Sequence, residues 1–174
     1  MLCALLLTIG CKLHEPEING ISIDKIREAK DIALQKDSGV HIASAFGARK
    51  NGEFMTDPDM TEVFKFIATA YDPYGPTDSI WELVCVDDEW NIITDSLQGM
   101  FEGIVVSVDL VNIEMDVCDA WDLLTEEHGV DSFHNWSLFQ PLHPDFEHPF
   151  FFFATDTGSF IVNTITSEIE FDPR

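Results

Sequence analysis

The densest group of side chains able to do chemistry is the hexapeptide His143-Pro144-Asp145-Phe146-Glu147-His148. It places two imidazoles and two carboxylates close together, and both groups can bind transition metals. It has no helical His-Glu-x-x-His spacing, and its Pro and Phe favour a loop. We therefore predict an acidic turn without a bound metal. A metal site at His143, Asp145 and His148, serving a metal-assisted hydrolase, is the alternative.

Two other stretches, Asp87-Asp88-Glu89 and Thr155-Asp156-Thr157-Gly158, are rich in oxygen ligands. Neither matches the twelve-residue calcium loop of EF-hands, and both lie between strand-like runs, so we expect hairpin tips. The chain has no Gly-x-Ser-x-Gly, no P-loop and no dinucleotide fingerprint. The sequence therefore predicts no catalytic residue, no cofactor and no enzyme activity. Cys85 and Cys118 lack metal-type spacing, and we expect two buried free thiols; a disulfide between them is the alternative.

The charge is strongly acidic and unevenly distributed. The 174 residues contain 9 Lys and Arg against 32 Asp and Glu, a formal net charge of −23. Between Lys65 and Arg174 there is no Lys or Arg, yet 22 of the acids lie there. Like charges repel, so nucleic acid and anionic membrane surfaces are disfavoured partners. The charge alone favours a solvated acidic surface; a protein partner with a basic surface, which the function predicted below requires, and divalent-cation binding are the alternatives.

The first twenty residues differ from the rest of the chain. Residues 1–10 are almost wholly apolar, and a polar stretch follows Cys11 abruptly. The run is too short to span a bilayer, but it is typical of an export signal. The segment Leu7-Thr8-Ile9-Gly10-Cys11 resembles a bacterial lipobox, which predicts lipidation at Cys11. The only membrane attachment expected is this lipid anchor; the alternative is a cytoplasmic protein with a frayed apolar N-terminus.

Hydrophobic periodicity predicts two helices and several strands. Helices are expected at 21–34, with Ser22 as N-cap, and at 114–127. Aromatic and β-branched runs separated by turn residues predict strands at 61–71, 80–86, 90–94, 104–111, 136–142, 149–154 and 159–166. Four consecutive Phe residues (150–153) indicate a central strand, and Asn51-Gly52 predicts a short hairpin.

The helix-plus-strands pattern occurs twice. Residues 21–29 match 113–121, with Asp24 on Asp116, and the strand-like run 81–86 matches 150–155. We therefore predict an α+β fold of two related units, each a helix packed on an antiparallel sheet. The expected divisions are a signal and tether at 1–20, a first unit at 21–112 and a second unit at 113–174.

The last segment, Ser159-Phe160-Ile161-Val162-Asn163-Thr164-Ile165-Thr166-Ser167-Glu168-Ile169, resembles the closing hairpin of PepSY-type domains. Thr166, Glu168 and Ile169 fit its Thr-Gly-Glu-Val ending, while Ser167 stands in place of the Gly. The resemblance covers about 60 residues, helix included. It implies an extracytoplasmic protein that binds or restrains peptidases and carries no catalytic residues.

Together these observations predict a non-catalytic binding or peptidase-inhibitory module of the cell envelope, exported and lipid-anchored through Cys11. Its acidic surface would meet a basic protein partner, with affinity falling as salt rises. Two rivals remain open at this point. One is the metal-assisted hydrolase at residues 143–148, and the other is a purely structural envelope protein.

Overall fold

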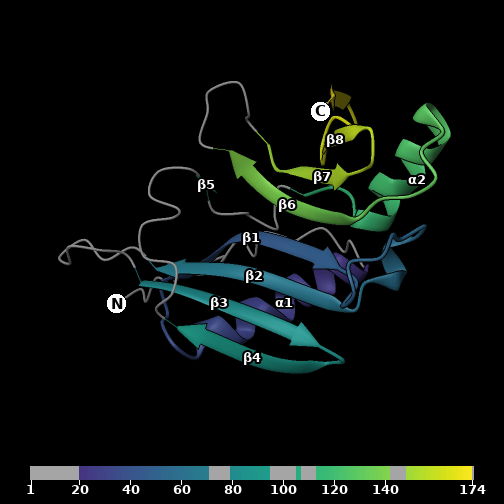
Figure 1. Cartoon of the computed structure of the whole chain (residues 1–174). Coiled ribbons are helices and arrows are strands. Elements are labelled where there is room, and N and C mark those ends of the chain that lie inside the picture. The colour runs from purple at the N-terminus through teal and green to yellow at the C-terminus, as the bar shows by residue number, and fades with distance from the viewer. Residues whose placement is uncertain (1–19, 71–78, 95–104, 107–112, 142–147, 174) are drawn as a thin grey trace, which may run out of the picture.

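The computed structural model describes residues 20–70, 79–94, 105–106, 113–141 and 148–173 (Figure 1). The first part of the chain forms, in order, α1 (Ile21–Leu34), β1 (Val40–Ala48), the 3-10 helix η1 (Pro58–Met60), β2 (Val63–Ala70), β3 (Ser79–Val86) and β4 (Glu89–Thr94). The second part forms β5 (Val105–Val106), α2 (Val117–His128), β6 (Asn135–Pro141), β7 (Phe150–Ala154), β8 (Gly158–Asn163) and β9 (Ile169–Pro173). Neither described helix is long and apolar enough to cross a membrane.

The strands form one antiparallel sheet, which confirms the predicted α+β class. Its order is β4-β3-β2-β1-β6-β7-β8-β9, and β5 pairs with β6 off this path. Four strands from each part of the chain thus meet where β1 pairs with β6.

This strand order contradicts the predicted equivalence of residues 81–86 and 150–155. The run 81–86 is β3, third from the β1–β6 pair, whereas residues 150–154 are β7, second from it, so β8 is the positional counterpart of β3.

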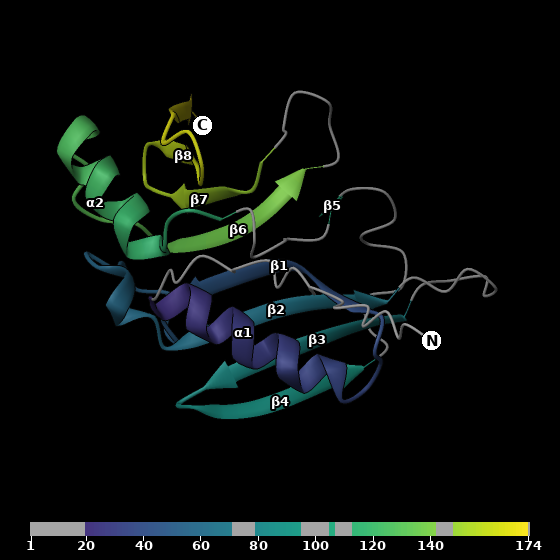
Figure 2. The same cartoon turned by 180° about the vertical axis from the view of Figure 1, so that it is seen from behind.

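Helix α1 begins and ends at the predicted residues because its apolar side chains keep an uninterrupted helical spacing. Its buried positions are Ser22, Ile23, Ile26, Ala29 and Ala33. They share one hydrophobic core with strand residues, and α1 contacts β1 and β2. Figure 2 shows the helix lying diagonally across the β1–β4 part of the sheet.

The predicted N-cap of α1 is wrong. Gly20 is the cap residue and makes no side-chain hydrogen bond, while Ser22 lies inside the helix. Asp116, which is 94 residues from Ser22, supplies the missing acceptor. A Cβ on Gly20 would lie 2.2 Å from the Asp116 Cγ, so a side chain at position 20 would displace that carboxylate.

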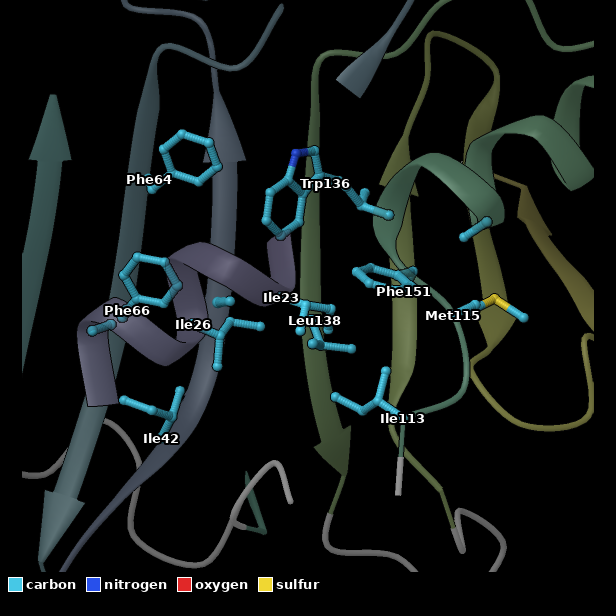
Figure 3. Packing of buried hydrophobic residues seen from close by; sticks show 14 of the residues in the cluster. Ile23, Ile26, Ile42, Phe64, Phe66, Ile113, Met115, Trp136, Leu138 and Phe151 are labelled. Carbon is cyan, nitrogen blue, oxygen red and sulfur yellow. The ribbon is translucent and has the colours of Figure 1, made fainter. Parts of the chain in front are cut away.

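The core is built on the face of the sheet that carries α1. One register row crosses six strands, and every member is at most 1% exposed: Leu83, Phe66, Ala45, Leu138, Phe151 and Val162. Figure 3 shows Phe66, Leu138 and Phe151 of this row together with Ile23 and Ile26 of α1. Because the row continues through β1 and β6, the two parts of the sheet share one core instead of each having its own.

Where β1 meets β6, Gly47 lies opposite Trp136. A Cβ on Gly47 would be 2.3 Å from the Trp136 ring, so glycine is needed for the indole to lie over β1. The buried indole Nε1 donates a hydrogen bond to Thr61 Oγ1 at 3.0 Å. Trp136 therefore links β6 to the segment that precedes β2.

The four-Phe segment forms β7, and its central position is confirmed. Phe151 and Phe153 are fully buried in the core, whereas Phe152 points to the other face and is half-buried. The predicted Asn51-Gly52 hairpin is wrong. Residues 49–52 do turn, but β1 pairs with the distant β2, and Met55 forms an isolated bridge with Phe133.

Candidate functional site

The candidate site is an exposed acidic surface formed by η1 and α2. We call it the η1–α2 acidic surface and define it by five exposed carboxylates: Asp57, Asp59, Asp119, Asp122 and Glu126.

Helix α2 starts with a capping box, which orients the first of these acids. Asp116 is the N-cap, and its Oδ1 accepts a hydrogen bond from the Cys118 N–H at 3.2 Å. In return, the Asp119 carboxylate accepts from the Asp116 N–H at 2.9 Å. Both bonds satisfy helix N–H groups that lack intrahelical partners. Asp122 and Glu126 follow at helical spacing and are exposed.

The η1 segment is held against α2 by hydrogen bonds. Asp57 caps η1 by accepting from the Asp59 N–H at 2.8 Å. The Trp121 Nε1 of α2 donates to the Thr56 carbonyl at 3.0 Å, and its ring packs on Phe133 with centroids 4.5 Å apart. Because Trp121 is buried, this contact places the carboxylates of η1 beside the first turns of α2.

A thiol lies at the centre of this contact. The Cys118 Sγ is 3.7 Å from an Asp59 oxygen, and potential ligand atoms of Asp57, Asp59 and Cys118 all lie within 4.8 Å of one another. Burial raises the pKa of the Cys118 thiol well above its usual range, and the charges of Asp116, Asp59 and Asp57 raise it further. A metal ion bound here would itself deprotonate the thiol. Exposed acids often lie this close without an ion, so we treat the arrangement as an acidic surface.

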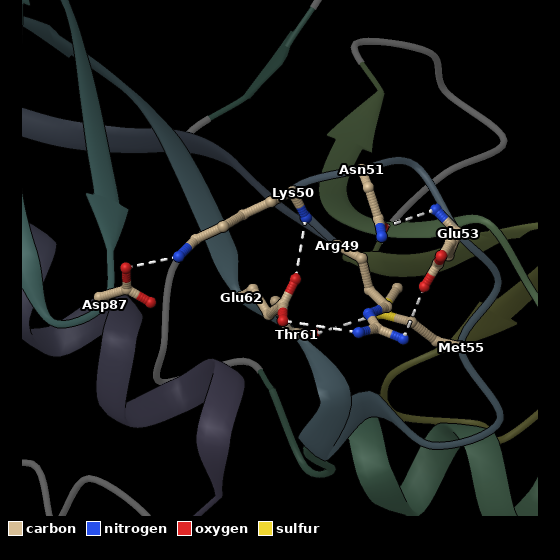
Figure 4. Close-up of polar contacts among 8 residues, drawn as sticks. All are labelled: Arg49, Lys50, Asn51, Glu53, Met55, Thr61, Glu62 and Asp87. Atoms are coloured by element: carbon tan, nitrogen blue, oxygen red, sulfur yellow. Dashed lines mark hydrogen bonds and ion pairs between the residues drawn. The ribbon is translucent and has the colours of Figure 1, made fainter.

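The Lys and Arg residues that the structure describes all lie in the first part of the chain, and several of them bind acids there. Arg49 pairs with Glu53 at 3.2 Å and with Glu62 at 3.6 Å, and Lys50 pairs with Asp87 (Figure 4). The hydrogen bond from the Lys50 N–H holds the pKa of Glu62 below its usual value, and Arg49 lowers this pKa further. These ion pairs neutralise acids around the β1–β2 connection.

Lys25 makes a second set of ion pairs, to Glu28 and Asp88, each at 2.9 Å. Burial by itself lowers the pKa of Lys25, but the hydrogen bonds to Asp88 and Glu28 outweigh that effect and raise it. By contrast, residues 113–173 include no Lys or Arg, and the ion pair seen among their described members is His134 with Asp156 at 3.1 Å. The α2 members of the η1–α2 acidic surface therefore have no cationic partner within the part of the chain that the structure describes.

The residues singled out from sequence are only partly covered by the structure. Cys11, His143 and Asp145 lie outside the described residues, so the lipidation and metal predictions there stay predictions. His148 is half-buried just before β7. Cys85 and Cys118 are both free thiols, as expected, but only Cys85 is buried as predicted, whereas Cys118 is half-buried.

The sequence analysis did not predict that Asp57 and Asp59 lie beside Cys118. Cys118 and Asp59 are 59 residues apart, and no spacing pattern connects them. Comparison of the chain with protein-family models, with curated proteins and with solved structures finds no match in any of the three. The function must therefore be argued from the chemistry of the surface itself.

Proposed function

We propose that this protein is a non-catalytic binding module that holds a basic protein partner on its η1–α2 acidic surface. The observation that carries the proposal is the set of exposed carboxylates on α2 with no cation beside them among the described residues. Asp122 and Glu126 stand four residues apart, and such like-charge pairs destabilise a helix by about 0.2–0.5 kcal/mol. A partner carrying Lys or Arg would remove this repulsion and pair with the acids.

The architecture that we propose consists of two related units, 21–112 and 113–174, with the second similar to PepSY-type domains. In its support, each part of the chain has a helix followed by four antiparallel strands, and the strand order reads outward from β1 on one side and from β6 on the other. The resemblance suggests a peptidase as the partner and an inhibitory role. The hydrolase alternative depends on His143, Asp145 and His148, of which the first two lie outside the described residues.

We also propose an extracytoplasmic location with a lipid anchor on Cys11, which rests on the lipobox-like sequence before that residue. Palmitate labelling of cells expressing the wild-type chain and Cys11→Ala tests it. Label lost in the variant supports the anchor, and equal labelling of both proteins refutes it.

The binding proposal is tested by removing charge from α2 at constant size. The test variant is Asp122→Asn with Glu126→Gln, and the matched control is Asp31→Asn with Glu170→Gln, which removes the same two charges from exposed sites elsewhere. We would measure binding to immobilised poly-lysine and to partners recovered from the envelope fraction. The test variant should bind about 5–50 times more weakly at low salt, because rim charges set affinity through screened electrostatics. Equal weakening by both variants, or affinity unchanged by salt, would refute the proposal.

A further inference from the structure

The two outer strands of the sheet, β4 and β9, differ in how their free edges are protected. Figures 1 and 2 draw β4 at the outer margin of the sheet, and no described strand pairs with its outer side. Unpaired edges can bind further strands, so proteins usually protect them with charges, prolines or short length.

The edge of β9 has these protective features. Glu168, Glu170 and Asp172 are exposed acids along and beside the strand, and Pro173 ends it without an N–H. The acids would repel any incoming acidic strand, and the proline removes one hydrogen-bond donor. These features oppose pairing with an acidic strand such as a second copy of this chain, although Phe171 is 45% exposed and the acids would not repel a basic segment.

Within β4 itself the one charged residue is Glu89 at its start, and the exposed acids Asp87 and Asp88 lie in the turn before it. The sequence of β4, Glu-Trp-Asn-Ile-Ile-Thr, contains no Lys, Arg or Pro. Ile92 and Ile93 are 36% and 44% exposed, and they point to opposite faces of the sheet because they are consecutive in a strand. Apolar side chains are thus available on both faces of an edge that nothing described covers.

The hairpin register shows which backbone groups point outward. Asp87 and Asp88 have φ values of 51° and 62°, which is the type I′ two-residue turn, and Val86 pairs with Glu89 across it. In such a hairpin the closing pair is hydrogen-bonded and bonded pairs alternate with non-bonded ones. The N–H and C=O groups of Trp90 and Ile92 therefore point away from β3.

The charge around this edge selects its partner. Asp87 and Asp88 are paired with Lys50 and Lys25 but remain 71% and 86% exposed, and exposed Glu89 has no ion pair among the described residues. A second copy of this chain would bring another net charge of −23 to the interface. A segment with Lys or Arg would instead be attracted.

We propose that the outer edge of β4 binds an extended segment of a partner protein as an additional strand. That segment alternates apolar residues, which pack beside Ile92, with basic residues on the opposite face, which lie near Glu89 and the 87–88 turn. Main-chain hydrogen bonds to Trp90 and Ile92 supply the affinity, as in other cases of β-strand addition. This proposal does not depend on the η1–α2 acidic surface.

The probe is a synthetic heptapeptide of alternating Val and Lys, titrated into the full chain while hydrogen exchange is followed. We expect saturable binding and new protection at the amides of Trp90 and Ile92. Ile92→Pro removes an outward N–H and no bond to β3, so it should weaken binding by about tenfold or more. The matched control, Phe171→Pro, makes the equivalent change on β9 and should leave affinity within about twofold.

Ile92→Lys serves as a second variant because it keeps the N–H but repels the basic peptide, and it should also weaken binding. A peptide with alternate N-methylated amides should not bind. Absence of saturable binding, equal effects of the two proline variants, or protection at Phe171 in place of Trp90 would overturn the proposal. A dimer seen by sedimentation without peptide, and abolished by Ile92→Pro, would overturn it in favour of self-pairing. Asp122→Asn with Glu126→Gln should leave peptide binding unchanged, so this proposal and the proposed function can fail separately.

Discussion

Asp116 and Ser22 join the N-termini of the two helices through one buried carboxylate. The Asp116 Oδ2 accepts hydrogen bonds from the Ser22 N–H at 3.0 Å, the Ile23 N–H at 3.1 Å and the Ser22 hydroxyl at 2.5 Å. The other oxygen caps its own helix at Cys118, and Ser22 Oγ accepts from the Val117 N–H at 3.3 Å. The positive ends of two helix dipoles therefore meet a single negative charge.

Replacing Asp116 should destabilise both helices together. We expect Asp116→Ala to lower the free energy of unfolding by about 2–4 kcal/mol, since one N-cap contributes about 0.5–2 kcal/mol and buried donors would also lose their acceptor. Urea unfolding measures the change. Asp119→Ala, which removes one bond of the capping box, is the control and should cost about 1 kcal/mol or less. Equal losses in the two variants would contradict the shared cap.

Ser22 and Asp116 should also be energetically coupled. Ser22→Ala alone should cost about 1 kcal/mol, but much less in a chain that already carries Asp116→Ala, because its hydroxyl would have lost its acceptor. A double-mutant cycle from urea unfolding gives the coupling energy. Additive effects of the two substitutions would show that the bond between them contributes nothing.

The four-Phe strand offers an internal comparison of its two faces. Phe151 is fully buried in the register row of the core, and its neighbour Phe152 is half-buried on the opposite face. Phe151→Ala should cost about 3–5 kcal/mol, the usual range for a buried Phe. Phe152→Ala should cost about half of that or less, since less apolar area returns to water. Thermal or urea unfolding of both variants measures the two losses. A larger loss for Phe152→Ala than for Phe151→Ala would contradict the assignment of the core to the Phe151 face of the sheet.

The turn between β8 and β9 holds a serine in a strained conformation. Ser167 has φ 61°, in the left-handed region that favours glycine. Ser167→Gly should therefore stabilise the protein by about 0.5–1 kcal/mol, measured by urea unfolding. The same change at exposed Thr166, which lacks a positive φ, should be neutral or destabilising and serves as the control. A destabilising Ser167→Gly would mean that the serine makes contacts worth more than the strain.

The Cys118 thiol should react slowly and make the fold sensitive to alkali. Its pKa is raised in the folded chain, so the folded state favours the protonated thiol. This contribution to stability is fully present below the pKa of the unfolded thiol, and it is lost as the pH rises above about 8.5. Alkylation by iodoacetamide, followed by peptide mass spectrometry, should be slower at Cys118 than in the urea-unfolded chain. Asp59→Asn removes one contributing charge and should speed the reaction. An unchanged rate would show that burial alone protects the thiol.

The helices and strands that sequence reasoning predicts correctly are those whose buried residues recur at a regular spacing. Residues 21–34 and the alternating Phe64, Phe66, Ala68 and Ala70 could be assigned because their spacing matches one helix face and one strand face. The second helix was expected at 114 and begins at Val117, since Asp116 is its cap and the preceding residues do not enter the helix. The class of fold followed from these assignments.

Features that depend on distant contacts could not be predicted. Ser22 looks like an N-cap from its neighbours, but its partner comes from the other part of the chain. The Asn51-Gly52 turn does not pair the segments beside it, because β1 gains a longer ladder with β2. The η1–α2 acidic surface brings together segments that no sequence spacing connects.

The confinement of cations to the first part of the fold has a practical consequence for how this protein can be studied. Trypsin cleaves after Lys and Arg, so residues 66–174 leave a digest as one peptide whether or not they are folded. Amine-directed cross-linkers and lysine acetylation likewise have no target there. A mass-spectrometric footprint of α2 and of β6 to β9 can use the Cys118 thiol and reagents for carboxylates, with a protease that cuts at acidic or aromatic residues.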